Sequence, residues 1–154
     1  MVAVNYEEIF NDFLGSVTDF ELMSLDRSSA YEIVGDYLHK SMADPYVSRL
    51  FTSYSLDDET QVFSFELERG RDDVADLEFV KAALVKWMAY EWVHGRVRNI
   101  TNISQAFMGK DQKFYSQAQH LSELRGLQDD LYREARYFIL SRGYVDNSYL
   151  NGGV

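Results

Sequence analysis

The sequence has no cysteine and a single proline, Pro45, among its 154 residues. Without cysteine the chain forms neither disulfide bonds nor thiolate metal sites, which fits a protein made in a reducing cytoplasm. No stretch approaches the roughly 18 consecutive apolar residues that span a membrane. The first residues lack the basic flank and long apolar run of a secretory signal. A chain of this length suits a single hydrophobic core, and one proline favours long elements.

Basic residues are also scarce, with 15 Lys and Arg against 25 Asp and Glu and a net charge of −10. This balance argues against a nonspecific DNA-binding protein, which needs a basic face to displace counterions. Residues 1–78 hold 18 acidic and 5 basic side chains, a net charge of −13, whereas residues 79–154 hold 7 acidic and 10 basic ones, a net charge of +3. Such unlike halves allow copies of the chain to pair head to tail. Solvated surfaces of unequal charge are the simpler alternative.

The motifs of common catalytic sites are missing. The chain has no Gly-x-Ser-x-Gly nucleophile elbow, and its nine glycines form neither Gly-x-Gly-x-x-Gly nor a phosphate-binding P-loop. The acidic stretch from Asp57 to Glu78 holds nine carboxylates but lacks the spacing of a calcium-binding loop. We interpret it as solvated surface or as an ionic contact with a neighbour. We therefore expect a protein that is not an enzyme and has no catalytic or cofactor-binding residues.

One pair of residues suggests a metal site. Glu91 and His94 form a Glu-x-x-His motif on an expected helix. Two such motifs and two further glutamates build the di-iron site of ferritin-like bundles, and this chain has one. We therefore interpret Glu91 and His94 as ordinary polar groups of a helix and assign no metal ligands. His120, in the first turn of the last expected helix, is interpreted as a structural hydrogen-bonding group.

Four stretches repeat apolar side chains at intervals of three and four residues, which is typical of amphipathic helices. The expected helices cover about residues 5–15, 29–44, 76–98 and 116–143. The expected buried stripe of the first helix is Tyr6, Ile9, Phe10, Phe13 and Leu14, and that of the last helix is Leu121, Leu124, Leu127, Leu131, Ala135 and Phe138. Capping boxes at Ser29–Glu32 and Ser116–Gln119 favour the starts of the second and the last helix. Asp76 suits the cap of the third helix, whose two tryptophans mark it as the central core helix.

The ends of these helices follow from proline and glycine. Pro45 is expected to stop the second helix and Gly143 the last one. Thr18–Asp26 is expected to be a connector. Ser104–Met108 is expected to form a short additional helix, which Gly109 ends.

Between the second and third helices the spacing of the apolar side chains changes to every second residue. Val62–Glu68 alternates, with Phe63 and Phe65 on one side, which is typical of a half-buried strand. Leu50–Tyr54 is its weaker partner, and Leu56–Glu59 is the expected loop between them. The pattern predicts a β-hairpin.

Together these elements predict a mainly α fold, a small helical bundle with long third and last helices and a short β-hairpin insertion around residues 50–69. The helical domain is expected over residues 1–143. Residues 144–154 are expected to form a C-terminal tail that becomes ordered on a partner, with its apolar side chains as anchors. These candidate anchors are Tyr144, Val145, Tyr149 and Leu150.

Two parts of the sequence carry a resemblance to a known family. The first part is Asp12–Leu22, which continues through Ala30–Leu38. The second is Met88–Val93, followed by Gly109–Leu121, in which Phe114–Leu121 reads Phe-Tyr-Ser-Gln-Ala-Gln-His-Leu. In order and motif they resemble the head-to-tail connector (adaptor) proteins of tailed bacteriophages, and the last element is the specific part. The family usually has Asn where Gln119 stands, and its tail is shorter.

The resemblance implies a small helical structural protein of the virion neck, between capsid and tail. Such proteins are made in the host bacterial cytoplasm and form a ring, commonly of twelve copies, beneath the portal protein after DNA packaging. The ring extends the DNA channel, receives the next neck (stopper) protein, and lets DNA pass without sequence-specific binding. The carboxyl-terminal region of the family reaches toward the portal, which would be the partner of the tail. Lys110 and Lys113, within the matching motif, are further candidate partner-binding residues.

Two other functions stay open at this point. One is an acidic binding protein that mimics nucleic acid or inhibits a basic partner, which a compact acidic monomer would favour. The other is a metal-dependent helical enzyme built on Glu91 and His94, which stoichiometric iron or zinc in the purified protein would favour.

Overall fold

The computed structural model describes the backbone of residues 1–106 and 111–145, and the side-chain surroundings of residues 1–99 and 119–142. The fold is mainly helical with a small antiparallel sheet, as the sequence predicted. In chain order the elements are β1 (Val2–Asn5), α1 (Tyr6–Ser16), α2 (Phe20–Ser24), α3 (Arg27–Ala43), α4 (Pro45–Ser48), β2 (Phe51–Asp57), β3 (Val62–Leu67), α5 (Asp73–Ala106) and α6 (Asp111–Val145).

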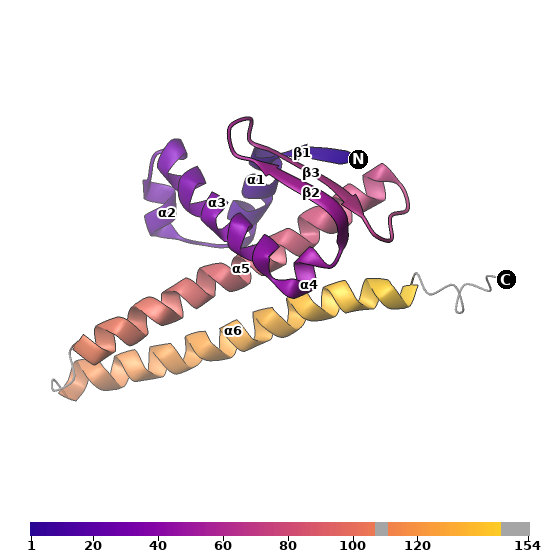
Figure 1. Ribbon diagram of the computed structural model, residues 1–154. Coiled ribbons are helices and arrows are strands. Elements are labelled where there is room, and N and C mark those ends of the chain that lie inside the picture. Colours follow the sequence, from indigo (N-terminus) through magenta and orange to yellow (C-terminus); the bar gives the residue numbers. More distant parts are fainter. Residues whose placement is uncertain (107–110, 146–154) are drawn as a thin grey trace.

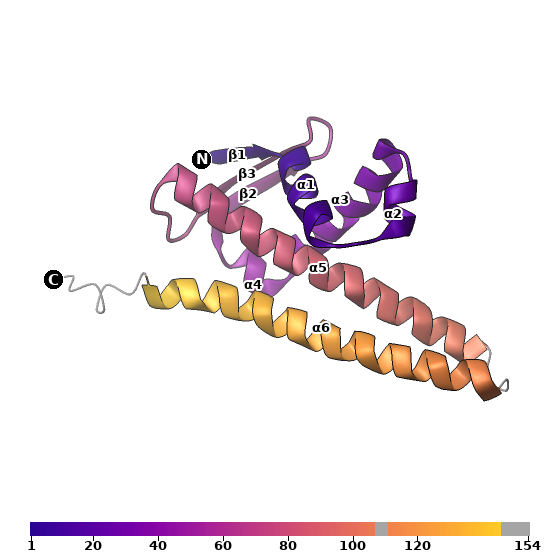
Figure 2. The same ribbon diagram turned by 180° about the vertical axis from the view of Figure 1, so that it is seen from behind.

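The molecule consists of a body and a long helical hairpin (Figure 1). The body contains the sheet and α1 to α4, and it packs against the N-terminal half of α5 through α1 and α3. Helix α6 returns antiparallel along α5, so its C-terminal half passes beside α4. The distal part of the hairpin extends beyond the body in both views (Figure 2). No helix within residues 1–106 and 111–145 is long and apolar enough to cross a lipid bilayer.

The sheet has the order β1-β3-β2, and both pairings are antiparallel. Phe63 and Phe65 of β3 are fully buried, whereas Glu66 is exposed, so the predicted alternation is confirmed. The predicted hairpin is confirmed too, but β2 continues to Asp57, so the expected loop at Leu56–Glu59 was placed too early. The turn forms after Asp57, because its carboxylate accepts the N–H groups of Glu59 and Thr60.

The core lies where α1, α3 and α5 meet the sheet. Most of its members come from α1, α3, α5 and β3, and the other elements add Val4, Leu22, Val47, Ala135 and Ile139. The largest fully buried side chains include Tyr6, Phe10, Phe13, Phe63, Phe65, Leu38, Met42, Leu84, Trp87 and Met88. The wide apolar face of α5 therefore makes it the central helix, as predicted.

The start of α3 differs from the prediction. The helix begins at Arg27, because the carboxylate of Asp26 accepts the backbone N–H of Ser29 at 3.2 Å and its hydroxyl at 2.6 Å. The expected capping box at Ser29 was therefore wrong. The helix ends at Ala43 as expected, but Pro45 also occupies the first position of α4.

The expected connector at Thr18–Asp26 contains the short helix α2. The carboxylate of Asp19 accepts the N–H of Leu22 at 3.1 Å and so caps this helix. Leu22 is buried beneath it. The sequence prediction missed α2 because one turn is too short to show a helical period.

The bounds of α5 also differ. The carboxylate of Asp72 accepts the N–H of Ala75 at 2.9 Å, so Asp72 caps the helix and the prediction of Asp76 as its cap was wrong. The helix continues to Ala106, and the separate helix expected at Ser104–Met108 was therefore wrong. The expected stop at Gly109 lies outside the described residues.

Helix α6 is longer than predicted at both ends. It begins at Asp111 rather than at Ser116, and it continues through Gly143 to Val145. Ala135 of its predicted stripe is buried, and so is Ile139 beside that stripe, but Leu127 of the stripe is exposed. The expectation of a fully buried stripe was wrong, because the distal hairpin extends beyond the body (Figure 2).

Candidate interaction surfaces

The structure places the predicted partner-binding residues at different ends of α6. Lys113 lies in its first turn, and Tyr144 and Val145 lie in its last turn. A rise of 1.5 Å per residue separates these ends by about 45 Å. Lys110, Tyr149 and Leu150 lie outside the described residues. The described residues of this set therefore form no single site.

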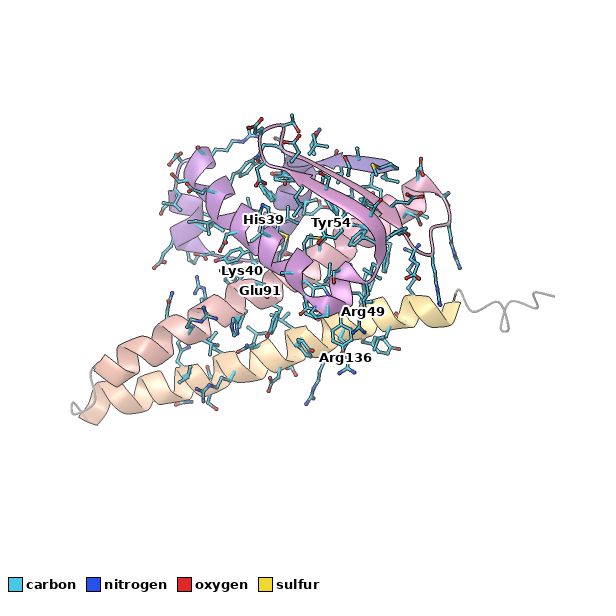
Figure 3. The ribbon with its side chains drawn as sticks, in the orientation of Figure 1. His39, Lys40, Arg49, Tyr54, Glu91 and Arg136 are labelled. Atoms are coloured by element: carbon cyan, nitrogen blue, oxygen red, sulfur yellow. The ribbon has the colours of Figure 1, made fainter. Side chains whose placement is uncertain are left out.

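Glu91 and His94 face different surroundings on α5. The Nδ1 atom of His94 lies 2.7 Å from the side-chain nitrogen of Gln128 on α6, and its Nε2 atom lies 3.1 Å from a guanidinium nitrogen of Arg98. His94 therefore links the two helices of the hairpin. Figure 3 places Glu91 on α5, facing Lys40 of α3. Among the residues whose side chains the structure describes, no group of three or more His, Cys, Asp or Glu could hold a metal ion.

Burial raises the pKa of the Glu91 carboxyl group above its ordinary value. The folded protein therefore binds the carboxyl proton of Glu91 more tightly than the unfolded chain does. The free energy of unfolding that this difference contributes is lost as the pH rises through the raised pKa. Glu91→Gln is expected to raise the melting temperature slightly at about pH 7 and to leave it unchanged at about pH 3. Thermal unfolding followed by circular dichroism measures this difference. Glu32→Gln, an exposed control on α3, should change neither value, and an equal effect of Glu91→Gln at both pH values would contradict the assignment.

Asp19 holds α2 against α5. Its carboxylate accepts the indole N–H of Trp92 at 2.8 Å and lies 3.0 Å from the guanidinium of Arg96. Burial alone would raise the pKa of Asp19, but the hydrogen bonds from Trp92, the Leu22 N–H and Arg96 together hold it below its ordinary value. A charged Asp19 therefore fixes the position of α2 against α5.

An apolar surface surrounds this short helix. We define the α2 corner as residues 20–26, in which Phe20 is 80% exposed and Met23 63% exposed. Leu25 is also exposed. Beside them lies a hollow of about 220 Å³, lined by Leu14, Val17, Asp19, Leu22, Met23, Leu25 and Ala30. Large apolar side chains gathered on a surface in this way are typical of protein–protein contacts.

A second exposed surface lies on the C-terminal half of α6. We define the α6 outer face as Arg133, Arg136, Tyr137 and Leu140, which share one side of the helix because they are three or four residues apart. Tyr137 is 74% exposed and Leu140 48% exposed. The guanidinium of Arg136 lies 5.0 Å from the ring centre of Tyr46 on α4, and Figure 3 shows Arg136 beside that helix.

A wide groove lies beside α3 and the β2–β3 turn, and its volume is about 1000 Å³. In it, the Oδ1 atom of Asp58 accepts the hydroxyl of Tyr6 at 2.8 Å and lies 2.9 Å from Nε2 of His39. Burial raises the pKa of the Tyr6 hydroxyl far above its ordinary value, with a smaller effect from Asp58. Tyr6 therefore stays protonated, and this chain of hydrogen bonds ties the turn to α1 and α3.

Sequence reasoning missed both the α2 corner and the α6 outer face. Phe20 and Met23 are apolar, so their type predicts burial, and Tyr137 lies beside the predicted stripe of α6. The signal present in the sequence is the apolar group Phe20-Glu21-Leu22-Met23 within an expected connector. One helical turn is too short to show which of these apolar side chains is buried, so the sequence alone does not single out Leu22.

Comparison of the chain with protein-family models, with curated proteins and with solved structures finds no match.

Proposed function

We propose that the protein is a structural subunit of a tailed-bacteriophage neck, a head–tail connector that forms a ring between the portal and the tail. The observation that carries this proposal is that one subunit exposes two unlike apolar surfaces, the α2 corner and the α6 outer face. Contacts between unlike surfaces of identical subunits are heterologous, and they close into rings when the rotation between neighbours permits. Such a ring would join the portal protein to the next neck protein and extend the DNA channel.

The sequence supports the same proposal. Its motifs resemble the connector family, most specifically in Phe114–Leu121. The net charge of −10 suits the wall of a channel, because DNA must slide past it without binding. In this proposal the protein acts without a cofactor, and its role is assembly rather than catalysis.

The direct test is addition to phage heads. Purified protein should bind DNA-filled, portal-bearing heads that lack it, and cryo-electron microscopy should show a ring on the axis of the portal. The number of subunits in that ring, commonly twelve in the family it resembles, is read from the same images. Heads without portal are the control and should bind none. Failure to bind portal-bearing heads under conditions in which the protein is folded would overturn the proposal.

The alternative is an acidic protein that mimics nucleic acid or inhibits a basic partner. The observation that favours it is the acidic β2–β3 turn, where Asp57, Asp58 and Glu59 are exposed. However, the carboxylate of Asp57 already accepts two backbone N–H groups, and that of Asp58 accepts the hydroxyl of Tyr6. Part of the hydrogen-bonding capacity of these carboxylates is therefore used within the protein. A monomer that binds a basic protein but no portal-bearing head would favour this alternative.

A further inference from the structure

We propose that the α2 corner of one copy binds the α6 outer face of the next copy, in a head-to-tail contact. The inference deepens the proposed function, on which it rests for the ring, because it names the two surfaces that join neighbouring subunits.

The apolar parts of the two surfaces are complementary. The α2 corner offers a hollow of about 220 Å³ that the exposed side chain of Met23 helps to line, and the exposed Phe20 belongs to the same short helix. The α6 outer face offers Tyr137, which is largely exposed, and Leu140, which is about half exposed. A large side chain that fills an apolar hollow is the usual anchor of a protein–protein contact. We therefore expect Leu140 and Tyr137 of one copy to lie against the hollow of the next.

The charges of the two surfaces are also complementary. The α2 corner includes the exposed acidic residues Glu21 and Asp26, and the neighbouring cation Arg27 pairs with Glu7. The α6 outer face includes Arg133 and Arg136. Glu134, which lies between them in sequence, instead pairs with Lys86 of α5 at 2.7 Å. Asp129 and Asp130 lie one turn before Arg133, so the basic part of the face begins at Arg133.

Contacts within the subunit hold both surfaces in place. The hydrogen bonds from Trp92 and Arg96 to Asp19 fix α2, and the burial of Ala135 and Ile139 fixes the C-terminal half of α6 against the body. Surfaces that are already ordered lose little conformational freedom on binding, which favours association.

Helix α2 and the C-terminal half of α6, which carry the two surfaces, lie toward opposite sides of the molecule in both views (Figures 1 and 2). One copy therefore cannot join its own α2 corner to its own α6 outer face. A contact between these surfaces in different copies leaves one free surface at each end, so it adds further copies until a ring closes.

Cross-linking tests the contact, because the chain has no cysteine of its own. A variant carrying both Met23→Cys and Leu140→Cys, treated with a bismaleimide, is expected to give a ladder of covalent dimers, trimers and larger species. A mixture of the two single variants should stop at dimers, and each single variant alone should give none. A variant that combines Met23→Cys with Val74→Cys is the control and should give no ladder. Val74 is an exposed apolar residue outside both surfaces, in the first turn of α5. Dimers from one single variant alone would indicate a two-fold contact and overturn the inference.

Charge exchange provides the second test. Glu21→Lys and Arg133→Glu should each weaken self-association by about five- to tenfold in sedimentation experiments. The two changes combined in one chain should restore it, because the contact then has the opposite polarity. Glu32→Lys, an exposed control on α3, should have no effect. Raising the salt from about 0.05 to 0.5 M should weaken the wild-type contact, since the Debye length falls from roughly 14 to 4 Å.

The outcomes separate this contact from the proposed function. If no ladder forms and the protein still builds a ring on portal-bearing heads, the surfaces are wrong and the connector function stands. If the ladder forms but the protein never binds such heads, the contact stands and the connector function is wrong. A protein that stays monomeric and forms no ladder at any concentration tested overturns the contact.

Discussion

Asp76→Ala is expected to lower the free energy of unfolding by about 3 kcal/mol, because it breaks a buried ion pair that joins the start of α5 to the end of α6. Both partners are largely buried, and an Oδ1 of Asp76 lies 2.8 Å from a guanidinium nitrogen of Arg142. The same carboxylate accepts the N–H of Arg71 at 3.0 and 3.1 Å. Alanine removes all of these acceptors at once. Urea unfolding followed by circular dichroism measures the loss.

The exposed neighbour Asp73 is the matched control for this prediction. Asp73→Ala, in the same turn of α5, should change the free energy of unfolding by no more than about 0.5 kcal/mol. Gly70→Ala offers a milder test of the same site, because its added Cβ would lie 2.7 Å from Oδ2 of Asp76 and displace the carboxylate. If Asp76→Ala were as stable as Asp73→Ala, the ion pair would not join the two helices.

Trp87→Ala is expected to lower the free energy of unfolding by about 4 kcal/mol, the usual loss for a large buried aromatic side chain. Trp87 is fully buried in α5. Its ring lies 5.5 Å from that of Tyr132 on α6 and stacks on Tyr46 of α4 at 6.2 Å. Its removal opens a cavity between the body and the hairpin, so α6 should also lose protection from amide hydrogen exchange.

Phenylalanine substitutions show which part of each tryptophan matters. The indole N–H of Trp87 has no acceptor in the part of the chain that the structure describes, so Trp87→Phe should lose only about 1–2 kcal/mol. Trp92→Phe removes the hydrogen bond to Asp19, and it should release α2 without unfolding the rest of the body. The assignment of Trp87 as the link between body and hairpin fails if Trp87→Ala keeps both the stability of the parent and the exchange protection of α6.

Burial could be predicted from the sequence better than the ends of the elements. The period of α1 and β3 correctly placed Phe10, Phe13, Phe63 and Phe65 in the core. Such a pattern is repeated over a whole element, so one exception does not change its assignment. The first residue of a helix depends instead on which one of several nearby residues caps its free N–H groups. At α3, Asp26 and Ser29 can both cap, and Asp26 wins because its carboxylate also accepts the Ser29 hydroxyl.

The features that the sequence did not predict depend on contacts between distant residues. Strand β1 has only four residues and forms by pairing with β3, about sixty residues away. Asp76 resembles a helix cap in sequence, whereas its main partner is Arg142, 66 residues later. The exposure of Phe20 and Met23 follows from the way α2 sits on Trp92 and Arg96. None of these contacts produces a pattern within a single stretch of sequence, so local periodicity could not predict them.

The place of β1 in the sheet has a consequence for the order of folding during synthesis. Val2–Asn5 leave the ribosome about sixty residues before their partner, Val62–Leu67. At roughly 5–20 residues per second, the nascent chain waits about 3–12 s before the sheet can close. Helices α1 and α3 are synthesised within that interval, and their apolar faces stay uncovered until α5 arrives. This topology therefore leaves the growing polypeptide open to chaperone binding until α5 has been synthesised.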